Sequence, residues 1–144
     1  NNVYASADAY AVSRVLYNLV SNAIKFTDEG GVVISAEEHE KYVVVTVSDT
    51  GVGINESFVP RLFDEFIQES DGLSRSHEGS GLGLAITGRL VYMMGGSVTV
   101  DSEKGVGSSF RITLKRWGGR VEYSRNTVRN HKGIQSGISG LESV

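Results

Sequence analysis

Three short segments combine polar side chains and glycines in patterns that suit the binding of a charged ligand. The first, residues 18–27, reads Asn-Leu-Val-Ser-Asn-Ala-Ile-Lys-Phe-Thr. Asn18 and Asn22 are four residues apart, so on a helix their amides share one face, and Lys25 follows on the same side. Mg²⁺ takes a few protein oxygens together with phosphates and water, so one neutral amide oxygen suits an ion that bridges to a nucleotide. Asparagines that pin a neighbouring loop are the alternative.

The second segment, residues 49–54, reads Asp-Thr-Gly-Val-Gly-Ile and directly follows an apolar run. A carboxylate at the end of a strand can accept a hydrogen bond from a ligand amino group, while glycines let bare backbone approach a ring. Asp49 is therefore a candidate acceptor, with Gly51, Gly53 and Ile54 beside it. An ordinary strand-ending turn has the same Asp-x-Gly pattern.

The third segment, residues 79–84, reads Gly-Ser-Gly-Leu-Gly-Leu and opens a predicted helix. Unhindered amides at a helix N-terminus form an anion site that the helix dipole strengthens. The candidate phosphate-binding residues here are Gly79, Ser80, Gly81, Leu82, Gly83 and Leu84. The dinucleotide fingerprint would need glycine in the sixth position, and the Gly-Lys-Ser/Thr of a P-loop is absent. A plain glycine-rich loop before a helix is the alternative.

The overall composition is that of one globular domain. The chain has 144 residues, of which 40% are hydrophobic and 22% charged, and no apolar run approaches the ~18 to 20 residues of a membrane-spanning helix. It has no cysteine, which excludes disulfides, thiol catalysis and cysteine-ligated metals. Its formal net charge of −3 gives no indication of nucleic-acid binding.

Helices and paired strands are expected to position the three segments. Apolar residues at three- and four-residue steps predict a long first helix, with Ser6 as its capping hydroxyl and Asp8 in its first turn, ending near Thr27 and Asp28. Two more helices are expected over residues 55–66 and 80–94, four strands over residues 32–36, 42–47, 97–101 and 108–114, and a loop over residues 67–79. Because this order is not a βαβ repeat, it predicts an α+β sandwich with the helices stacked on one sheet face.

The regular pattern ends after Arg116, which predicts a domain over residues 1–116 and a tail or linker over residues 117–144. Residues 115–144 hold six Lys or Arg against two Glu, so the tail is basic and rich in Gly, Ser and Asn. A basic tail on an acidic body could bind a polyanion, but a solvated extension is the plainer interpretation.

Taken together and in this order, the motifs resemble the catalytic ATP-binding domain of sensor histidine kinases. Residues 62–66, Leu-Phe-Asp-Glu-Phe, and residues 95–110, which run from Gly-Gly-Ser-Val to Gly-Ser-Ser-Phe, add to the resemblance, which covers residues 3–115. It implies the Bergerat ATP-binding fold of the GHKL superfamily, a two-layer α/β sandwich with helices on one face of a mixed, largely antiparallel sheet. ATP (or ADP) would lie between the helical layer and residues 67–79, which would act as a lid.

The resemblance also implies roles for residues around the nucleotide. Asn22 would ligate Mg²⁺ and Lys25 would meet the phosphates, so that Asn18, Asn22 and Lys25 form the catalytic group. Phe26 would wall the site, and Asp49 would accept a hydrogen bond from the adenine amino group. The remaining residues implied to bind nucleotide are Gly51 and Gly53 by close approach, Ile54 next to them, Phe63 and Phe66 as anchors of the lid, residues 79–84 over the phosphates, and Ser109, which stands where the family usually has a threonine near the adenine.

The implied function is transfer of the ATP γ-phosphate to a histidine on a separate dimerising helical hairpin, within a two-component system that includes a response regulator. His39 and His77 each precede a glutamate, but neither continues into the family's His-Glu-Leu-Arg-Thr-Pro motif or lies on a predicted long helix. This chain is therefore expected to bind ATP and Mg²⁺ without phosphorylating itself. We expect a cytoplasmic domain of a larger parent that can itself be anchored in a membrane, with no nucleic-acid partner.

Two other functions use the same fold. ATP-hydrolysing clamps, such as topoisomerase, mismatch-repair and chaperone relatives, carry a glutamate four residues before the magnesium asparagine to activate water. Here that position is Asn18, whose amide cannot take up a proton at neutral pH, and the same argument weighs against anti-sigma-factor serine kinases. A module that holds nucleotide without transferring phosphate stays open, because Asn22, Lys25 and Asp49 are all present.

Overall fold

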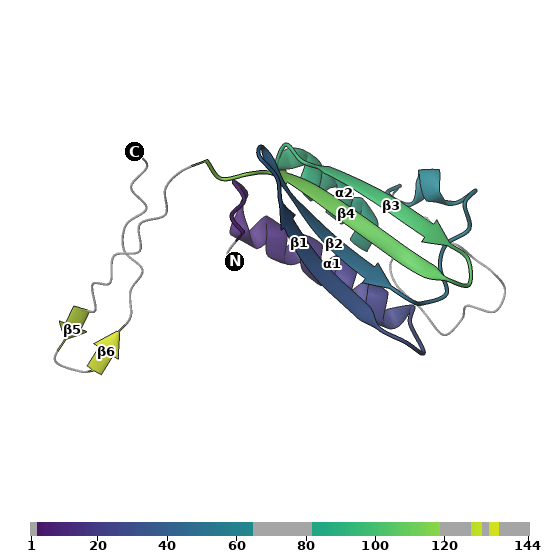
Figure 1. Cartoon of the computed structure of the whole chain (residues 1–144), viewed down its shortest axis with the longest axis horizontal. Helices are drawn as coiled ribbons and strands as arrows, with labels where there is room; N and C mark the ends of the chain where they lie inside the picture. Colours follow the sequence, from purple (N-terminus) through teal and green to yellow (C-terminus); the bar gives the residue numbers. More distant parts are fainter. Residues whose placement is uncertain (1–2, 65–81, 119–127, 131–132, 136–144) are drawn as a thin grey trace.

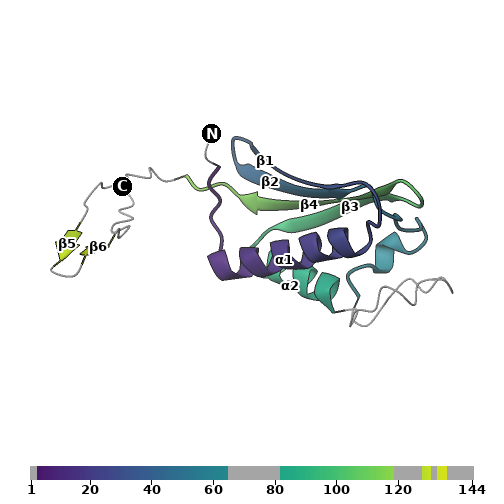
Figure 2. The ribbon, with the colours of Figure 1, turned by 90° about the horizontal axis from the view of Figure 1, so that it is seen from below.

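Two helices cover one face of a four-stranded antiparallel sheet (Figures 1 and 2). The structure is a computed structural model that describes residues 3–64, 82–118, 128–130 and 133–135. Its elements are, in order, α1 (Ala9–Lys25), β1 (Val32–Glu38), β2 (Tyr42–Asp49), the 3₁₀ turn η1 (Val59–Arg61), α2 (Gly83–Met93), β3 (Ser97–Glu103), β4 (Gly107–Lys115), β5 (Val128–Asn130) and β6 (Gly133–Gln135). The α+β sandwich that the sequence predicts is confirmed.

The strand order is β1-β2-β4-β3, and all three pairings are antiparallel, within the mixed, largely antiparallel sheet that the resemblance implied. Successive side chains of a strand point to opposite faces, so the sheet has a helix side and an outer side. Val47 of β2 is paired with Phe110 of β4, and both belong to the core on the helix side. Asp49 and Ser108, two residues away on the same strands and paired with each other, therefore also lie on the helix side.

The core forms between this sheet face and the two helices, which Figure 2 shows side by side beneath the sheet. Its fully packed members are Val15, Leu19, Ala23, Val47, Val91, Phe110, Ile112 and Leu114. Ala11, Val15, Leu19 and Ala23, which recur every four positions of α1, are buried, whereas the intervening polar residues are partly buried or exposed. The predicted amphipathic helix is thus confirmed.

Two corrections concern helix starts. Asp8, and not Ser6, caps α1: its carboxylate accepts a hydrogen bond from Ala11 N at 2.7 Å. The backbone N–H of Ser6 instead donates to the carbonyl of Lys115 at the end of β4. α2 begins at Gly83, after the non-helical residue Leu82, whereas the predicted helix began at residue 80; residues 80 and 81 lie outside the described residues.

Two further differences concern short elements. Of the helix predicted over residues 55–66, the described residues 55–64 form a series of turns with one 3₁₀ turn that contains Pro60. The Asn55 side chain accepts from the backbone N–H of Ser57 and shapes the first of these turns. The predicted tail contains the paired strands β5 and β6, which the sequence analysis did not predict. Trp117 N donates to Tyr4 O, so backbone contacts continue one residue past the predicted end of the domain.

Candidate functional site

The C-terminal end of α1 lies against the turn that follows β2. Val52 N donates a 3.0 Å hydrogen bond to the carbonyl of Phe26, the residue that caps α1. Asn22 and Lys25, both partly buried, lie within the last turn of this helix, and the Lys25 ammonium is 5.4 Å from the centroid of the Phe26 ring. The structure therefore brings the predicted metal and phosphate residues next to the segment that begins at Asp49.

Asn18 connects the two helices. Its amide nitrogen donates to the carbonyl of Gly83 at 3.2 Å and lies 3.5 Å from the hydroxyl of Thr87, which is completely buried. Asn18 thus pins a neighbouring segment, which is the alternative role considered for the asparagines. Because the amide is used as a donor toward the first turn of α2, its contact positions the helix in which the glycine-rich segment ends.

Asp49 is the last residue of β2 and lies on the helix side of the sheet, partly buried. Its Oδ1 accepts a hydrogen bond from Gly51 N at 2.9 Å, which closes the turn after the strand. The ordinary strand-ending turn considered for this segment is therefore present, and it leaves the second carboxylate oxygen of Asp49 outside this bond. A carboxylate accepts only, so any polar group that meets it must donate.

Gly51 and Gly53 are required by the protein's own packing, a reason that the sequence did not predict. A Cβ atom on Gly51 would lie 2.1 Å from the carbonyl oxygen of Phe26. One on Gly53 would lie 1.9 Å from the carbonyl oxygen of Glu103, and the φ of Gly53 is +65°. Both glycines allow this turn to fit between the end of α1 and the β3–β4 connection.

A small hydroxyl network lies behind this turn and is built on Ser102 and Ser108, neither of which was predicted as a site residue. Ile54 N donates to the hydroxyl of Ser102 at 2.8 Å, and Ser102 Oγ is 2.9 Å from Ser108 Oγ. Ser102 also donates to the carbonyl of Gly107 at 3.0 Å. Ser108 is 8% exposed and is the strand partner of Asp49. The network thus joins the predicted site residue Ile54 to Ser108, which lies beside Asp49, the candidate acceptor for the adenine amino group.

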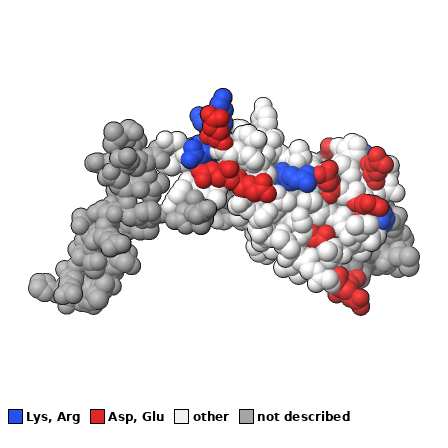
Figure 3. Space-filling view, viewed as in Figure 1, with Lys and Arg blue, Asp and Glu red and all other residues white. Residues whose placement is uncertain are grey.

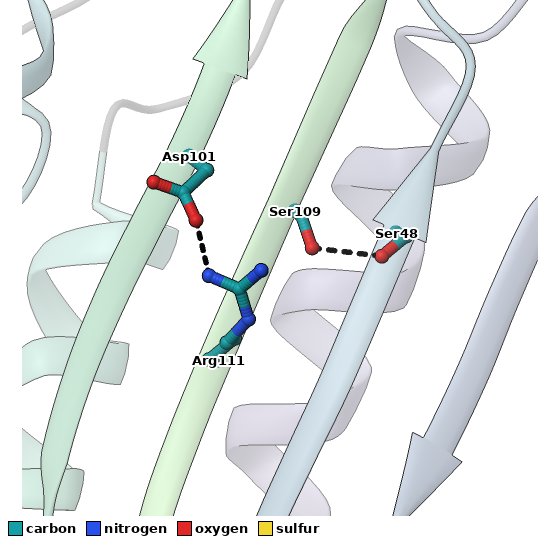
Figure 4. Close-up of polar contacts among 4 residues, drawn as sticks. All are labelled: Ser48, Asp101, Ser109 and Arg111. Carbon is teal, nitrogen blue, oxygen red and sulfur yellow. Dashed lines mark hydrogen bonds and ion pairs between the residues drawn. The ribbon is translucent and has the colours of Figure 1, made fainter.

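Ser109, predicted to lie near the adenine, is on the other side of the sheet. Figure 4 shows its hydroxyl and that of Ser48 meeting on the outer face, with the helices behind the strands, and their oxygens are 2.8 Å apart. Asp101 and Arg111 form an ion pair on the same face. Ser109 therefore does not lie on the face that carries Asp49, whereas Ser108 does. The sequence holds this signal, because Ser108 lies two residues before the apolar residue Phe110 and alternate residues of a strand share a face.

Phe63 and the first turn of α2 also contribute to this end of the molecule. The Phe63 ring lies against α2, where a Cβ on Gly88 would be 3.4 Å from Phe63 Cδ1. Leu84 and Ile54 pack against the core, and Leu82 immediately precedes α2, where its carbonyl accepts from Ile86 N. The predicted site residues Phe66, Gly79, Ser80 and Gly81 lie outside the described residues, as does His77.

One histidine, the possible metal ligands and the surface charge of the described residues bear on which ligands and reactions the chain can support. His39 lies in the β1–β2 hairpin, where its ring stacks on Tyr42 with the centroids 4.5 Å apart, and it is exposed. Among the described residues there is no group of three or more His, Asp or Glu that could hold a metal ion by itself. On the face that Figure 3 shows, acidic and basic side chains of the described residues are interspersed, so this face has no continuous basic surface.

Comparisons with known proteins agree with this geometry. The family described as "Histidine kinase-, DNA gyrase B-, and HSP90-like ATPase" matches residues 7–118. Sensor histidine kinase RcsC of Escherichia coli (strain K12) is 42% identical over 138 residues, which cover 96% of this chain and 14% of that protein. Sensor histidine kinase GacS of Pseudomonas protegens is 48% identical over 112 residues, 74% of this chain and 12% of that protein. The chain therefore spans only a small part of these relatives.

Solved structures give the same result. Full-length ShkA in complex with AMPPNP superposes with a TM-score of 0.70 and 35% identity, over 80% of this chain and 24% of that one. The mycobacterial sensor histidine kinase MprB superposes with a TM-score of 0.69 and 28% identity, over 78% of this chain and 76% of that one. The chain belongs to the family of histidine kinase-, DNA gyrase B- and HSP90-like ATPases, and its relatives within that family are sensor histidine kinases.

Proposed function

We propose that this chain is the ATP-binding, phosphoryl-donating domain of a two-component sensor histidine kinase. It binds ATP and passes the γ-phosphate to a histidine on the dimerisation hairpin of its parent, from which a response regulator receives it. The observation that carries the proposal is the contact between the end of α1, with Asn22 and Lys25, and the turn that begins at Asp49. Phosphoryl transfer requires mainly positioning and stabilisation of charge, which these residues supply.

In this proposal the adenine ring of ATP lies on the helix side of the sheet. Asp49 accepts a hydrogen bond from the adenine amino group, and Ser108, its strand partner, lies beside the same group. Phe26 and Ile54 line the site from α1 and from the turn after β2. Gly51 and Gly53 hold that turn in place through the backbone packing described above.

The residues present fit a magnesium ion that arrives with the nucleotide. The described residues supply Asn22 as one neutral amide oxygen and contain no cluster that could hold a metal alone. Mg²⁺ keeps several waters and takes phosphate oxygens as ligands, so a single protein oxygen suffices. Bound in this way, the ion would neutralise phosphate charge. Asn22 would hold it through its amide oxygen, and Lys25 would add a second positive charge for the same phosphates.

The lid assignment is part of the proposal. Phe63, packed on α2, holds one end of the segment between η1 and α2, and Gly83 starts the helix at its other end. We infer that Phe66 and the segment Gly79 to Leu84 cover the phosphates between these two ends.

The bounds of the domain are also part of the proposal. Residues 1–116 would form the ATP-binding domain, which would act in the cytoplasm, and residues 117–144 would form a basic linker. No described helix is both long and apolar enough to cross a membrane.

The position of Asn18 favours phosphate transfer over hydrolysis. Its amide nitrogen is engaged with the carbonyl of Gly83, and an amide cannot remove a proton from water at neutral pH. A clamp-type ATPase would need a base at this position. The attacking group must therefore come from elsewhere, as it does in a kinase whose acceptor is on another domain.

Phosphate transfer from labelled ATP tests the proposal. The 144-residue chain is mixed with [γ-³²P]ATP, Mg²⁺ and the helical hairpin of its parent kinase. We expect label on a hairpin histidine, stable in alkali and labile in acid, and no label when either protein is left out. Robust hydrolysis by the chain alone would favour the clamp function instead. ATP binding without any transfer would reduce the assignment to a nucleotide-binding module.

A further inference from the structure

The hydroxyl of Ser102 has three neighbours, and their chemistry fixes the direction of each hydrogen bond. The N–H of Ile54, at 2.8 Å, can only donate, and the carbonyl of Gly107, at 3.0 Å, can only accept. A serine hydroxyl has one hydrogen and two lone pairs. Ser102 therefore gives its single hydrogen to Gly107 and accepts from Ile54.

The third neighbour of Ser102 is Ser108, whose Oγ is 2.9 Å away. On distance alone either hydroxyl could be the donor, but only donation by Ser108 lets Ser102 keep its hydrogen bonds to both Ile54 and Gly107. Its own hydrogen then points toward Ser102. What Ser108 can offer to any other group is its lone pairs, so it is an acceptor toward the rest of its surroundings.

Ser108 and Asp49 are paired across β4 and β2 on the helix side of the sheet, where the Cβ atoms of paired residues are ~4.5–5.5 Å apart. The Asp49 carboxylate is also an acceptor. Two neighbouring acceptors call for a ligand group that donates. A purine with an amino group at its 6-position has two N–H bonds there, whereas a purine with a carbonyl at that position would place an acceptor against acceptors.

We propose that Ser102 is a positioning residue that holds the Ser108 hydroxyl as an acceptor and so selects nucleotides with a 6-amino group over those with a 6-carbonyl group. Ser102 acts through Ser108 and need not touch the ligand. The inference rests on the proposed function, because it assumes that the base lies beside Asp49. It adds a residue whose effect is on the choice of base and not on phosphate binding.

The test compares ATP with inosine triphosphate, which has a carbonyl at the 6-position and a hydrogen on N1. Dissociation constants of both are measured by calorimetry with Mg²⁺ on the 144-residue chain. In Ser102→Ala, Ser108 is free to turn its hydrogen toward a 6-carbonyl, so the preference for ATP should fall about tenfold. Ser102→Thr keeps the hydroxyl and should retain the wild-type preference.

Ser48→Ala is the matched control, because it removes one member of the other serine pair of β4, on the outer face, where the oxygens are 2.8 Å apart. It should leave the ratio of the two dissociation constants unchanged. Ser102→Cys, with a weakly accepting thiol of similar size, repeats the test if the alanine variant is unstable. In a Ser108→Ala background, Ser102→Ala should cause no further change in the ratio.

The possible results separate this inference from the proposed function. If Ser102→Ala weakens ATP and inosine triphosphate by the same factor, or leaves both unchanged, Ser102 only supports the structure and the inference is overturned. If the wild-type chain binds no ATP, the proposed function fails and the inference falls with it. A wild-type preference for ATP that survives in both Ser102→Ala and Ser102→Cys overturns the inference alone.

Discussion

The amide nitrogen of Asn18 donates a hydrogen bond to the carbonyl oxygen of Gly83, 3.2 Å away, and joins the middle of α1 to the first residue of α2. These residues are 65 positions apart in the sequence. The bond connects the helix that carries Asn22 to the helix that ends the glycine-rich segment. The relative position of the two candidate phosphate-binding segments therefore depends on this amide.

Replacing Asn18 by alanine should loosen this connection. We expect the free energy of unfolding to fall by ~1 kcal/mol, the value of one partly buried hydrogen bond, and ATP affinity to fall as α2 shifts. Urea unfolding and calorimetry measure the two effects. Ser13→Ala, which removes a hydroxyl bonded to Ala9 O within α1, is the control and should leave ATP affinity as in the wild type. Unchanged stability and affinity in Asn18→Ala would refute the positioning role.

Gly51→Ala tests why glycine stands after Asp49. A Cβ here would meet the Phe26 carbonyl, so the unliganded protein should lose ~1–3 kcal/mol of unfolding free energy, as overpacked sites do. Gly31→Ala is the matched control, because a Cβ there has nothing within 4 Å and its stability should hardly change. If Gly51→Ala were as stable as the wild type but bound ATP poorly, the glycine would serve the ligand and not the packing.

Ser108→Ala and Ser109→Ala test which face of β4 meets the base. Each change removes one serine–serine hydrogen bond, so both should lower the unfolding free energy by similar amounts of ~0.5–1.5 kcal/mol. Only Ser108 lies beside Asp49, so ATP affinity should fall in Ser108→Ala and stay at the wild-type value in Ser109→Ala. The opposite result, measured by calorimetry, would restore the assignment of Ser109.

Asn22→Ala tests the magnesium assignment. The wild-type chain should bind ATP more tightly with Mg²⁺ than with a chelator, because the Asn22 oxygen completes the shell of the ion. In Asn22→Ala this gain, which we expect to be about tenfold, should vanish while the melting temperature stays close to that of the wild type. Ser21→Ala, on the same turn of α1, should keep the full magnesium effect. A variant at residue 22 with undiminished magnesium dependence would exclude the residue as a ligand.

The periodicity of apolar residues was sufficient to predict the long helices and strands. The four-residue recurrence of Ala11, Val15 and Leu19 predicts the buried face of α1, and that face is buried in the structure. The β-rich runs before Asp49 and around Phe110 likewise form the strands β2 and β4 in the structure. Such patterns are reliable because one buried face must repeat with the geometry of its element. The family resemblance rested on motifs carried by these same elements.

Contacts between distant segments could not be read in the same way. Gly51 and Phe26 lie on different elements and come into close contact in the structure. The sequence shows only that one is a glycine after Asp49 and the other an aromatic residue near the end of the first helix. Asp8 replaced Ser6 as the cap because the backbone of Ser6 is paired with Lys115. Each of these is a tertiary contact that local patterns do not contain.

The affinity of Asp49→Asn for ATP tests the central claim most directly, with Asp101→Asn as the same chemical change on the outer face of the sheet. If Asp49 accepts the adenine amino group, replacement of its carboxylate should cost ~1.5–3 kcal/mol, the value of a hydrogen bond to a charged group. Calorimetry with ATP and Mg²⁺ should then show a roughly 10- to 150-fold weaker dissociation constant for Asp49→Asn and a wild-type value for Asp101→Asn. Equal ATP affinity in the wild type and Asp49→Asn would contradict the account.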